Sequence, residues 1–166
     1  MPRAVPDARF LLDDFERLGA AQLYACLRLR SEVFVVEQRC VYQDLDGLDA
    51  ASLHLRRVAG DGRLLAYARL LPVGVDFPES CSIGRIATAP AARGKGHGRA
   101  LVLRALRECR GRWPGARIRI RAQTYLLRFY TELGFAPEGE VFLEDGIPHQ
   151  EMCFAGRPSA PLPSAG

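Results

Sequence analysis

Apolar residues recur at helical spacing in three segments of the chain. The predicted helices run from Gly19 to Gln38, from Arg99 to Arg112 and from Thr124 to Leu133. The β-branched run 33–36 is a point at which the first helix can end early, because branched side chains are restricted within a helix. Thr124 is expected to cap the third helix, and Gly134 is expected to end it.

Several shorter segments carry the alternating or β-branched patterns that are typical of strands. They run from Arg9 to Asp13, Leu53 to Val58, Leu64 to Pro72, Ser82 to Thr88, Arg117 to Ala122, Phe135 to Leu143 and His149 to Phe154. The Gly-Asp-Gly turn at 60–62 joins the second strand to the third. Because the helices interrupt the strands at irregular intervals, we expect an α/β (α+β) fold with helices packed on a mixed sheet, not a repeated barrel.

The composition fits one ordinary globular domain. The chain has 166 residues, of which 48% are hydrophobic and 25% charged. No stretch approaches the roughly 20 apolar residues of a membrane span, and residues 1–14 lack the apolar core of a signal peptide. We therefore expect a cytoplasmic protein without a membrane partner. Residues 1–155 are expected to form a single domain, followed by a disordered tail over 156–166, which is rich in Pro, Ala and Ser.

The basic residues gather around a glycine-rich run. The net charge is +4, and Lys95 is the only lysine. An excess of arginine from Arg93 to Arg121 suits an anionic cofactor better than nucleic acid, since no motif interleaves basic and aromatic residues. The five cysteines are odd in number and form no CxxC pair. A zinc or other metal site is therefore not expected.

The glycine-rich run is Arg93-Gly94-Lys95-Gly96-His97-Gly98, between a predicted strand and a predicted helix. It lacks the third glycine of a dinucleotide fingerprint, and its lysine is not followed by the Ser or Thr of a Walker loop. Glycines let the backbone approach a ligand, and the amides and dipole of a helix start attract anions. With the charges of Arg93 and Lys95, the run predicts a diphosphate site. The alternative is a plain strand-to-helix turn.

The run resembles the [Q/R]-x-x-G-x-[G/A] signature of the GNAT acyltransferase superfamily, and the chain resembles its ElaA-like branch from about Arg9 to Phe154. The residues that carry the closer resemblance are 29–38, 42–47, 83–86, 122–123, 129–130, 134–135 and 144–149. The resemblance implies a GNAT fold, with a mixed, mostly antiparallel, twisted sheet flanked by helices and with splayed central parallel strands. It also implies acetyl-CoA as the donor.

In such a fold the strand before the loop pairs with the pantetheine arm of the cofactor. The resemblance therefore implies a cofactor site made of Ile86, Ala87, Thr88, Arg93, Gly94, Lys95, Gly96, His97, Gly98, Arg99, Gln123 and Tyr130. Gln123 would hydrogen-bond the pantetheine arm. Tyr130 would lie beside the sulfur as the general acid, because a phenol is protonated at neutral pH and can donate. The alternative for Tyr130 is core packing.

The general base stays open among Glu37, Asp44, Asp46, Glu79, His54 and His149. Glu37 is favoured as a catalytic and substrate-binding residue, because the first helix borders the acceptor site in this fold; a salt bridge at the helix end is the alternative. The strand 82–88 carries no carboxylate and offers Arg85 instead. Arg85 would bind an anionic acceptor, hold Glu37 or Glu79, or form a structural ion pair.

These features predict an N-acetyltransferase that passes an acetyl group to a small-molecule or peptide amine by direct attack in a ternary complex. A covalent route through Cys81 is disfavoured, because no His or Asp is placed beside it by sequence. Acidic residues 44–49 are one place where a cationic amine could bind. The alternative is a non-catalytic acyl-CoA-binding module of the same fold, and a nucleic-acid binder is the weakest hypothesis. A homodimer is compatible with the sequence.

Overall fold

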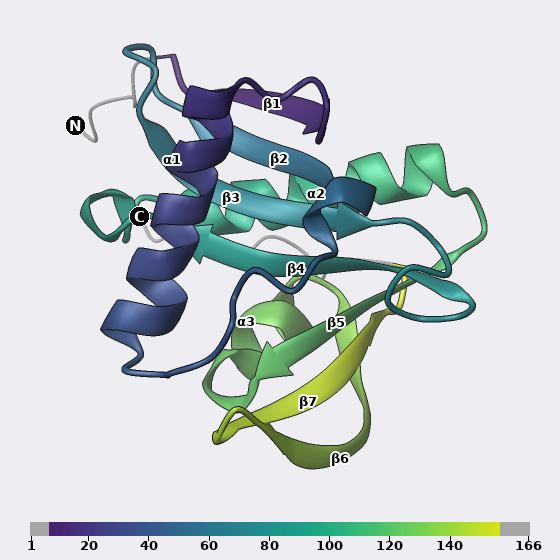
Figure 1. Cartoon of the computed structure of the whole chain (residues 1–166). Helices are drawn as coiled ribbons and strands as arrows, with labels where there is room; N and C mark the ends of the chain where they lie inside the picture. Colours follow the sequence, from purple (N-terminus) through teal and green to yellow (C-terminus); the bar gives the residue numbers. More distant parts are fainter. Residues whose placement is uncertain (1–6, 157–166) are drawn as a thin grey trace, which may run out of the picture.

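The computed structural model describes residues 7–156 and contains one seven-stranded sheet. The strands lie in the order β1-β2-β3-β4-β5-β7-β6, as Figure 1 shows. Their bounds are β1 Arg9–Asp14, β2 Leu53–Val58, β3 Leu64–Leu71, β4 Ser80–Thr88, β5 Arg117–Gln123, β6 Phe135–Glu144 and β7 Ile147–Phe154. All neighbours pair antiparallel except β4 and β5, which are parallel.

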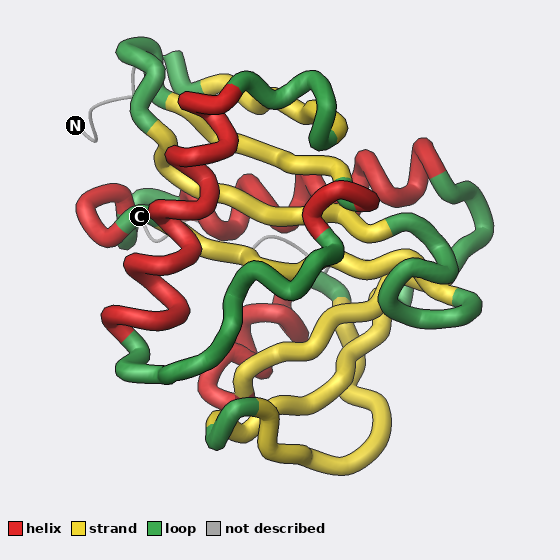
Figure 2. Tube along the Cα trace, in the orientation of Figure 1, coloured by secondary structure: helices red, strands yellow, loops and turns green. Residues whose placement is uncertain are grey.

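Helices cover both faces of this sheet (Figures 1 and 2). Helix α1 (Ala20–Arg30) continues into a π-helical segment, η1 (Ser31–Glu37). Helix α2 (His97–Arg112) and the short α3 (Leu127–Glu132) pack on the opposite face. The described residues also contain three single helical turns, η2 (Asp49–Ala51), η3 (Pro90–Ala92) and η4 (Thr124–Leu126). No helix within residues 7–156 is long and apolar enough to cross a membrane.

The alternation of β3 explains why helices are needed on both faces. Ala66 and Ala68 point into the main core, which α2 and α3 fill with residues such as Leu101. Tyr67 points the other way, into a smaller core beneath α1 that includes Leu29. Successive side chains of a strand face opposite sides, so this strand is buried on both.

The two parallel strands at the centre separate after a short contact. β4 and β5 pair only where Ser80–Ser82 meets Arg117–Arg119, and beyond that point neither strand is the other's neighbour. The pairing of β4 with β3 also shifts register near Arg85, which has a positive φ of 51°. A bulge of this kind bends a strand. The sheet therefore opens into a V between the carboxyl ends of β4 and β5.

The predicted fold class and the splayed parallel pair are confirmed, and the corrections are local. The β-branched run 33–36 does not end the first helix but widens it into π-helical turns. The expected cap at Thr124 is wrong, since η4 and α3 begin without a side-chain cap and the segment opens as a 3-10 turn. The predicted tail lies outside the described residues, apart from 156.

Candidate active site

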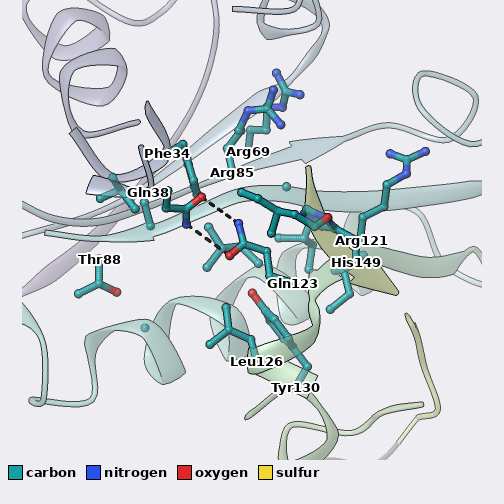
Figure 3. A pocket seen from close by; sticks show the side chains of 18 of the residues that line it. Phe34, Gln38, Arg69, Arg85, Thr88, Arg121, Gln123, Leu126, Tyr130 and His149 are labelled. Carbon is teal, nitrogen blue, oxygen red and sulfur yellow. Dashed lines mark hydrogen bonds between the residues drawn. The ribbon is translucent and has the colours of Figure 1, made fainter. Parts of the chain in front are cut away.

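A cavity of about 1010 Å³ occupies the V between β4 and β5 (Figure 3). It extends from the amino end of α2, past α3 and η1, to the turn between β6 and β7. Nearly all the predicted site residues line it, namely Glu37, Arg85, Ile86, Ala87, Thr88, Arg93, Gly94, Gly96, His97, Gly98, Arg99, Gln123 and Tyr130. Lys95 does not line it, although its backbone belongs to the same loop.

The amino end of α2 offers a row of backbone donors. The first helical hydrogen bond runs from the Ala100 amide to the Gly96 carbonyl at 3.0 Å, so the amides of residues 97–99 have no partner within the helix. Gly94 and Gly96 have φ of +74° and +80°, and a Cβ at either position would meet no atom within 4 Å. A Cβ on Gly98 would lie 3.1 Å from Thr88 Oγ1. The loop therefore fits a diphosphate held by backbone N–H groups.

Arg93, the first residue of the loop, is engaged by Glu37. Its Nη1 and Nη2 donate to the two carboxylate oxygens at 2.9 and 2.8 Å, and both side chains are about two-fifths exposed. The hydrogen bonds from Arg93 hold the pKa of Glu37 below its usual value. Glu37 thus takes the salt-bridge role that was the alternative to catalysis, and a carboxylate with a lowered pKa is a poorer base.

His97 contributes its backbone rather than its ring. The side chain is only 3% exposed, and Nδ1 accepts a hydrogen bond from Arg57 Nε at 2.9 Å. Burial, together with the charges of Arg57 and Lys95, lowers the pKa of His97 and keeps the ring neutral. Because the ring is neutral and turned towards Arg57, the backbone N–H of His97 is the donor that this residue can offer to an anion.

The splayed edge of β4 supplies the middle of the cavity. Ala87 and Thr88 pair with β3 on one side, while β5 has already diverged on the other. Across the gap, the Gln38 and Gln123 side-chain amides donate to each other at 3.3 and 3.1 Å (Figure 3). Gln123 was expected to bind a pantetheine arm, and its amide is oriented here by Gln38, whose role the sequence did not predict. The two residues are 85 positions apart, so no local pattern pairs them.

Tyr130 points its hydroxyl into the cavity from below the sheet (Figure 3). The residue is 5% exposed, its ring packs edge-on against Phe129 and Phe135, and no described residue hydrogen-bonds its hydroxyl. Burial raises the pKa of Tyr130 well above the usual range. The phenol therefore stays protonated and is suited to donate a hydrogen bond to a developing thiolate.

The acidic loop after η1 is held by three arginines, two of which are buried. Asp44 accepts from Arg30 Nε at 2.9 Å and from Arg85 Nε at 2.7 Å, while Asp46 accepts from Arg69 Nη1 at 2.8 Å. Arg30 is fully buried and Asp44 is 4% exposed. Two predictions change as a result. The partner of Arg85 is Asp44 rather than Glu37 or Glu79. The aspartates of residues 44–49, predicted as a place for a cationic amine, are already paired with arginines.

The remaining candidates for the general base differ in whether they line the cavity. Glu79 does not line the cavity, and His54 is fully buried, with its ring nitrogens on the Tyr67 hydroxyl and the Asp49 carbonyl. Cys81 is also fully buried and away from the cavity, so it has no access to a thioester. All five cysteines are free thiols. His149 alone among the candidate histidines lines the cavity.

No cluster of His, Cys, Asp or Glu suited to a metal ion occurs among residues 7–156. The side chains and backbone described above line the cavity. A diphosphate fits at one end, an extended arm fits along β4, and a protonated phenol stands near the centre. This arrangement suits a coenzyme A thioester.

Comparison with known proteins agrees with this reading. The family model described as acetyltransferase (GNAT) domain matches residues 28–155. Protein ElaA of Escherichia coli is 44% identical over 137 residues, which cover 81% of this chain and 88% of that protein.

Two solved structures show the same fold. An acyl-CoA N-acyltransferase from Pseudomonas aeruginosa superposes with a TM-score of 0.83 at 41% identity, covering 90% of this chain and all of that one. The crystal structure of Escherichia coli ElaA gives 0.82 at 40% identity, covering 89% of this chain and 99% of that one. The chain is an acyltransferase and belongs to the GNAT acetyltransferase family, among relatives of ElaA.

Proposed function

We propose that this protein is an acetyl-CoA-dependent N-acetyltransferase that acts on a small-molecule or peptide amine. The observation that carries the proposal is the single cavity that runs from the unpaired amides of 97–99 to the hydroxyl of Tyr130. Its length along the splayed edge of β4 suits a pantetheine arm. The five free cysteines support a cytoplasmic location, where thiols stay reduced.

The donor would be held by backbone and charge together. The amides of Gly94 to Arg99 would bind the pyrophosphate, with Arg93 and Arg99 adding charge at the rim of the cavity. Ile86, Ala87 and Thr88 would pair with the pantetheine arm through their backbone, and Gln123 would add a side-chain hydrogen bond. Coenzyme A supplies the activated acetyl thioester. The residues of the chain would position the thioester.

The transfer would proceed by direct attack. The burial of Cys81 argues against an acyl-enzyme, because a carrier thiol must reach the thioester. Tyr130 would stabilise the departing thiolate with a hydrogen bond. Its raised pKa makes hydrogen bonding a better description of this role than full proton transfer. The amine would arrive on the side of the thioester opposite Tyr130, so that enzyme, acetyl-CoA and amine would form a ternary complex.

The test is the release of coenzyme A from acetyl-CoA with a panel of amines: spermidine, a peptide with a free amino terminus, a peptide with an internal lysine, and a set of amino acids. Mass spectrometry of the product should show an added acetyl group on one amine class, at a rate above acetyl-CoA hydrolysis. Propionyl- and octanoyl-CoA measure the preference for the acyl chain. Tight acetyl-CoA binding with no acetylated product from any amine would contradict the proposal and favour the non-catalytic acyl-CoA-binding module.

A further inference from the structure

We propose that His149 and Glu144 form the subsite for the acceptor amine, and that His149 Nε2 is the general base. The inference rests on the proposed acetyl transfer and names the group that removes the proton from the amine. His149 lies on β7 and Glu144 ends β6, so both belong to the hairpin that borders the cavity.

The register of β5 and β7 places His149 on the face opposite Tyr130. Gln123 pairs directly with His149, so their side chains share one face of the sheet. Ile120, Ala122 and Tyr130 belong to the core on the other face. In Figure 3, Tyr130 lies below the Gln38–Gln123 bridge. A thioester between the two faces would have its leaving group near Tyr130 and its attacker near His149.

The tautomer of His149 is fixed by a backbone carbonyl. Nδ1 lies 2.7 Å from the Ile147 carbonyl oxygen, which can only accept, so Nδ1 carries the hydrogen. In the neutral ring the lone pair is then on Nε2. The ring is 8% exposed and stacks on Phe142 at 6.0 Å between centroids, with 24° between the planes. Imidazole takes up and releases a proton readily near neutral pH.

Glu144 provides the matching charge. Its Oε2 lies 3.8 Å from His149 Nε2, which is too long for a direct hydrogen bond. One amine nitrogen can nevertheless sit about 2.9 Å from both atoms, which is the ordinary hydrogen-bond distance. Within residues 7–156, Glu144 has no arginine partner. In the same cavity, Glu37 and Asp76 are each paired with one arginine, and Asp46 is paired with two.

The step balances without a further reactant. The bound ammonium gives one proton to Nε2, and the neutral amine attacks the thioester carbon. The C–N bond forms and the C–S bond breaks. The second amine proton leaves with the sulfur as the thiol of coenzyme A, and the imidazolium returns its proton to solvent. The products are an amide, free coenzyme A and one proton.

Other charged groups surround the His149 ring. Glu144 faces it from β6, Asp145 lies in the adjoining turn, and Arg121 lines the same cavity from β5, where it pairs with Asp76 and Glu151. Glu151 is also the next residue on the same face of β7. A pH profile must therefore be compared between variants that keep these neighbours.

His149→Asn is the variant of choice, because an Asn amide can still donate to the Ile147 carbonyl while Nε2 is lost. At pH 7, kcat/KM for the amine acetylated by the wild type should fall by about 10²-fold or more, the usual size of a general-base effect. The deficit should shrink below about tenfold at pH 9.5, because solvent then deprotonates an amine whose pKa is about 10.4. The Kd for acetyl-CoA should stay within about twofold, since the donor site is untouched.

Glu144→Gln should raise KM for the amine several-fold, and Glu140→Gln, an exposed glutamate of β6 outside the cavity, should change nothing. Nitrogen NMR of the wild-type ring should show the Nδ1–H tautomer. A deficit of His149→Asn that is equal at every pH, full activity of that variant, or the Nε2–H tautomer would each overturn the inference while leaving acetyl transfer intact. A wild type that acetylates no amine of the panel would instead refute the proposed function, and this inference with it.

Discussion

Replacing Glu37 with glutamine is expected to tighten the binding of acetyl-CoA. In the structure, Glu37 occupies both terminal nitrogens of Arg93, and Arg93 belongs to the loop proposed to bind the pyrophosphate. An incoming diphosphate must therefore compete with a carboxylate. The variant removes that competitor and leaves a neutral side chain of the same size.

The size of the effect follows from the exposure of the pair. The side chains of Glu37 and Arg93 are 42% and 43% exposed, so solvent screens the attraction between their charges. The interaction energy of the pair is therefore small. Exposed ion pairs contribute about 0.2–1 kcal/mol. Because about 1.4 kcal/mol is a factor of ten, Kd should fall by about 1.4- to 5-fold. The effect should shrink at high salt.

Calorimetric titration of Glu37→Gln with acetyl-CoA measures the change in Kd directly. The kcat of the same variant distinguishes a Glu37 that only pairs with Arg93 from a Glu37 that acts as the general base. If Glu37 only holds Arg93, kcat stays within about twofold. A general base contributes about 10²- to 10⁴-fold, so a loss of kcat of that size with unchanged Kd would refute the reasoning and restore Glu37 as the base. Arg93→Gln is the matched control and should weaken binding.

Four further outcomes are expected. Tyr130→Phe should lower kcat by at least tenfold with the Kd for acetyl-CoA kept, and a loss below twofold would contradict its proposed hydrogen bond to the departing thiolate. Gly96→Ala should lower the free energy of unfolding by about 1 kcal/mol, measured as a lower Tm, because Gly96 has a positive φ. The variant should also weaken acetyl-CoA binding, because the new methyl group enters the proposed anion site, and unchanged binding would argue against that site. Asp44→Asn should cost about 3–5 kcal/mol, because it leaves Arg30 partly uncompensated in the interior; a loss below 1 kcal/mol in urea unfolding would contradict this. Burial alone would raise the pKa of Asp46 and Asp49, but the hydrogen bonds and charges of Arg69 and Arg30 outweigh burial and lower both pKa values. The stability that these two ionised carboxylates contribute should be complete above the ordinary carboxyl range and should be lost as pH falls below about 4. A urea unfolding midpoint that stays constant from pH 5 to pH 3 would refute this prediction.

Local patterns were sufficient for most of the fold. The strand Leu53–Val58 has the predicted bounds, and β4 begins only two residues before the predicted start at Ser82. The errors lie where tertiary contacts override propensity. The run 33–36 stays helical because Val33 packs into the core beneath α1 beside Tyr67. The helix propensities of residues 33–36 alone could not show that Val33 is buried.

The loop proposed to hold the diphosphate could be picked out from the sequence because it is continuous. The loop from Arg93 to Gly98 carries its own glycines and charges, and it lies between a strand and a helix as predicted. The rest of the cavity lining comes from distant segments. Asp44 meets Arg85 across 41 positions, and Gln38 meets Gln123 across 85. Only folding reveals which carboxylates are already paired and that His149 has a free ring nitrogen.

The most direct test of the central claim is a crystal structure of this protein with acetyl-CoA. The account predicts the pyrophosphate on the amides of residues 94–98, the pantetheine arm along Ile86 to Thr88, and the thioester sulfur within hydrogen-bond distance of the Tyr130 hydroxyl. A cofactor bound outside the V between β4 and β5, or a sulfur remote from Tyr130, would contradict it.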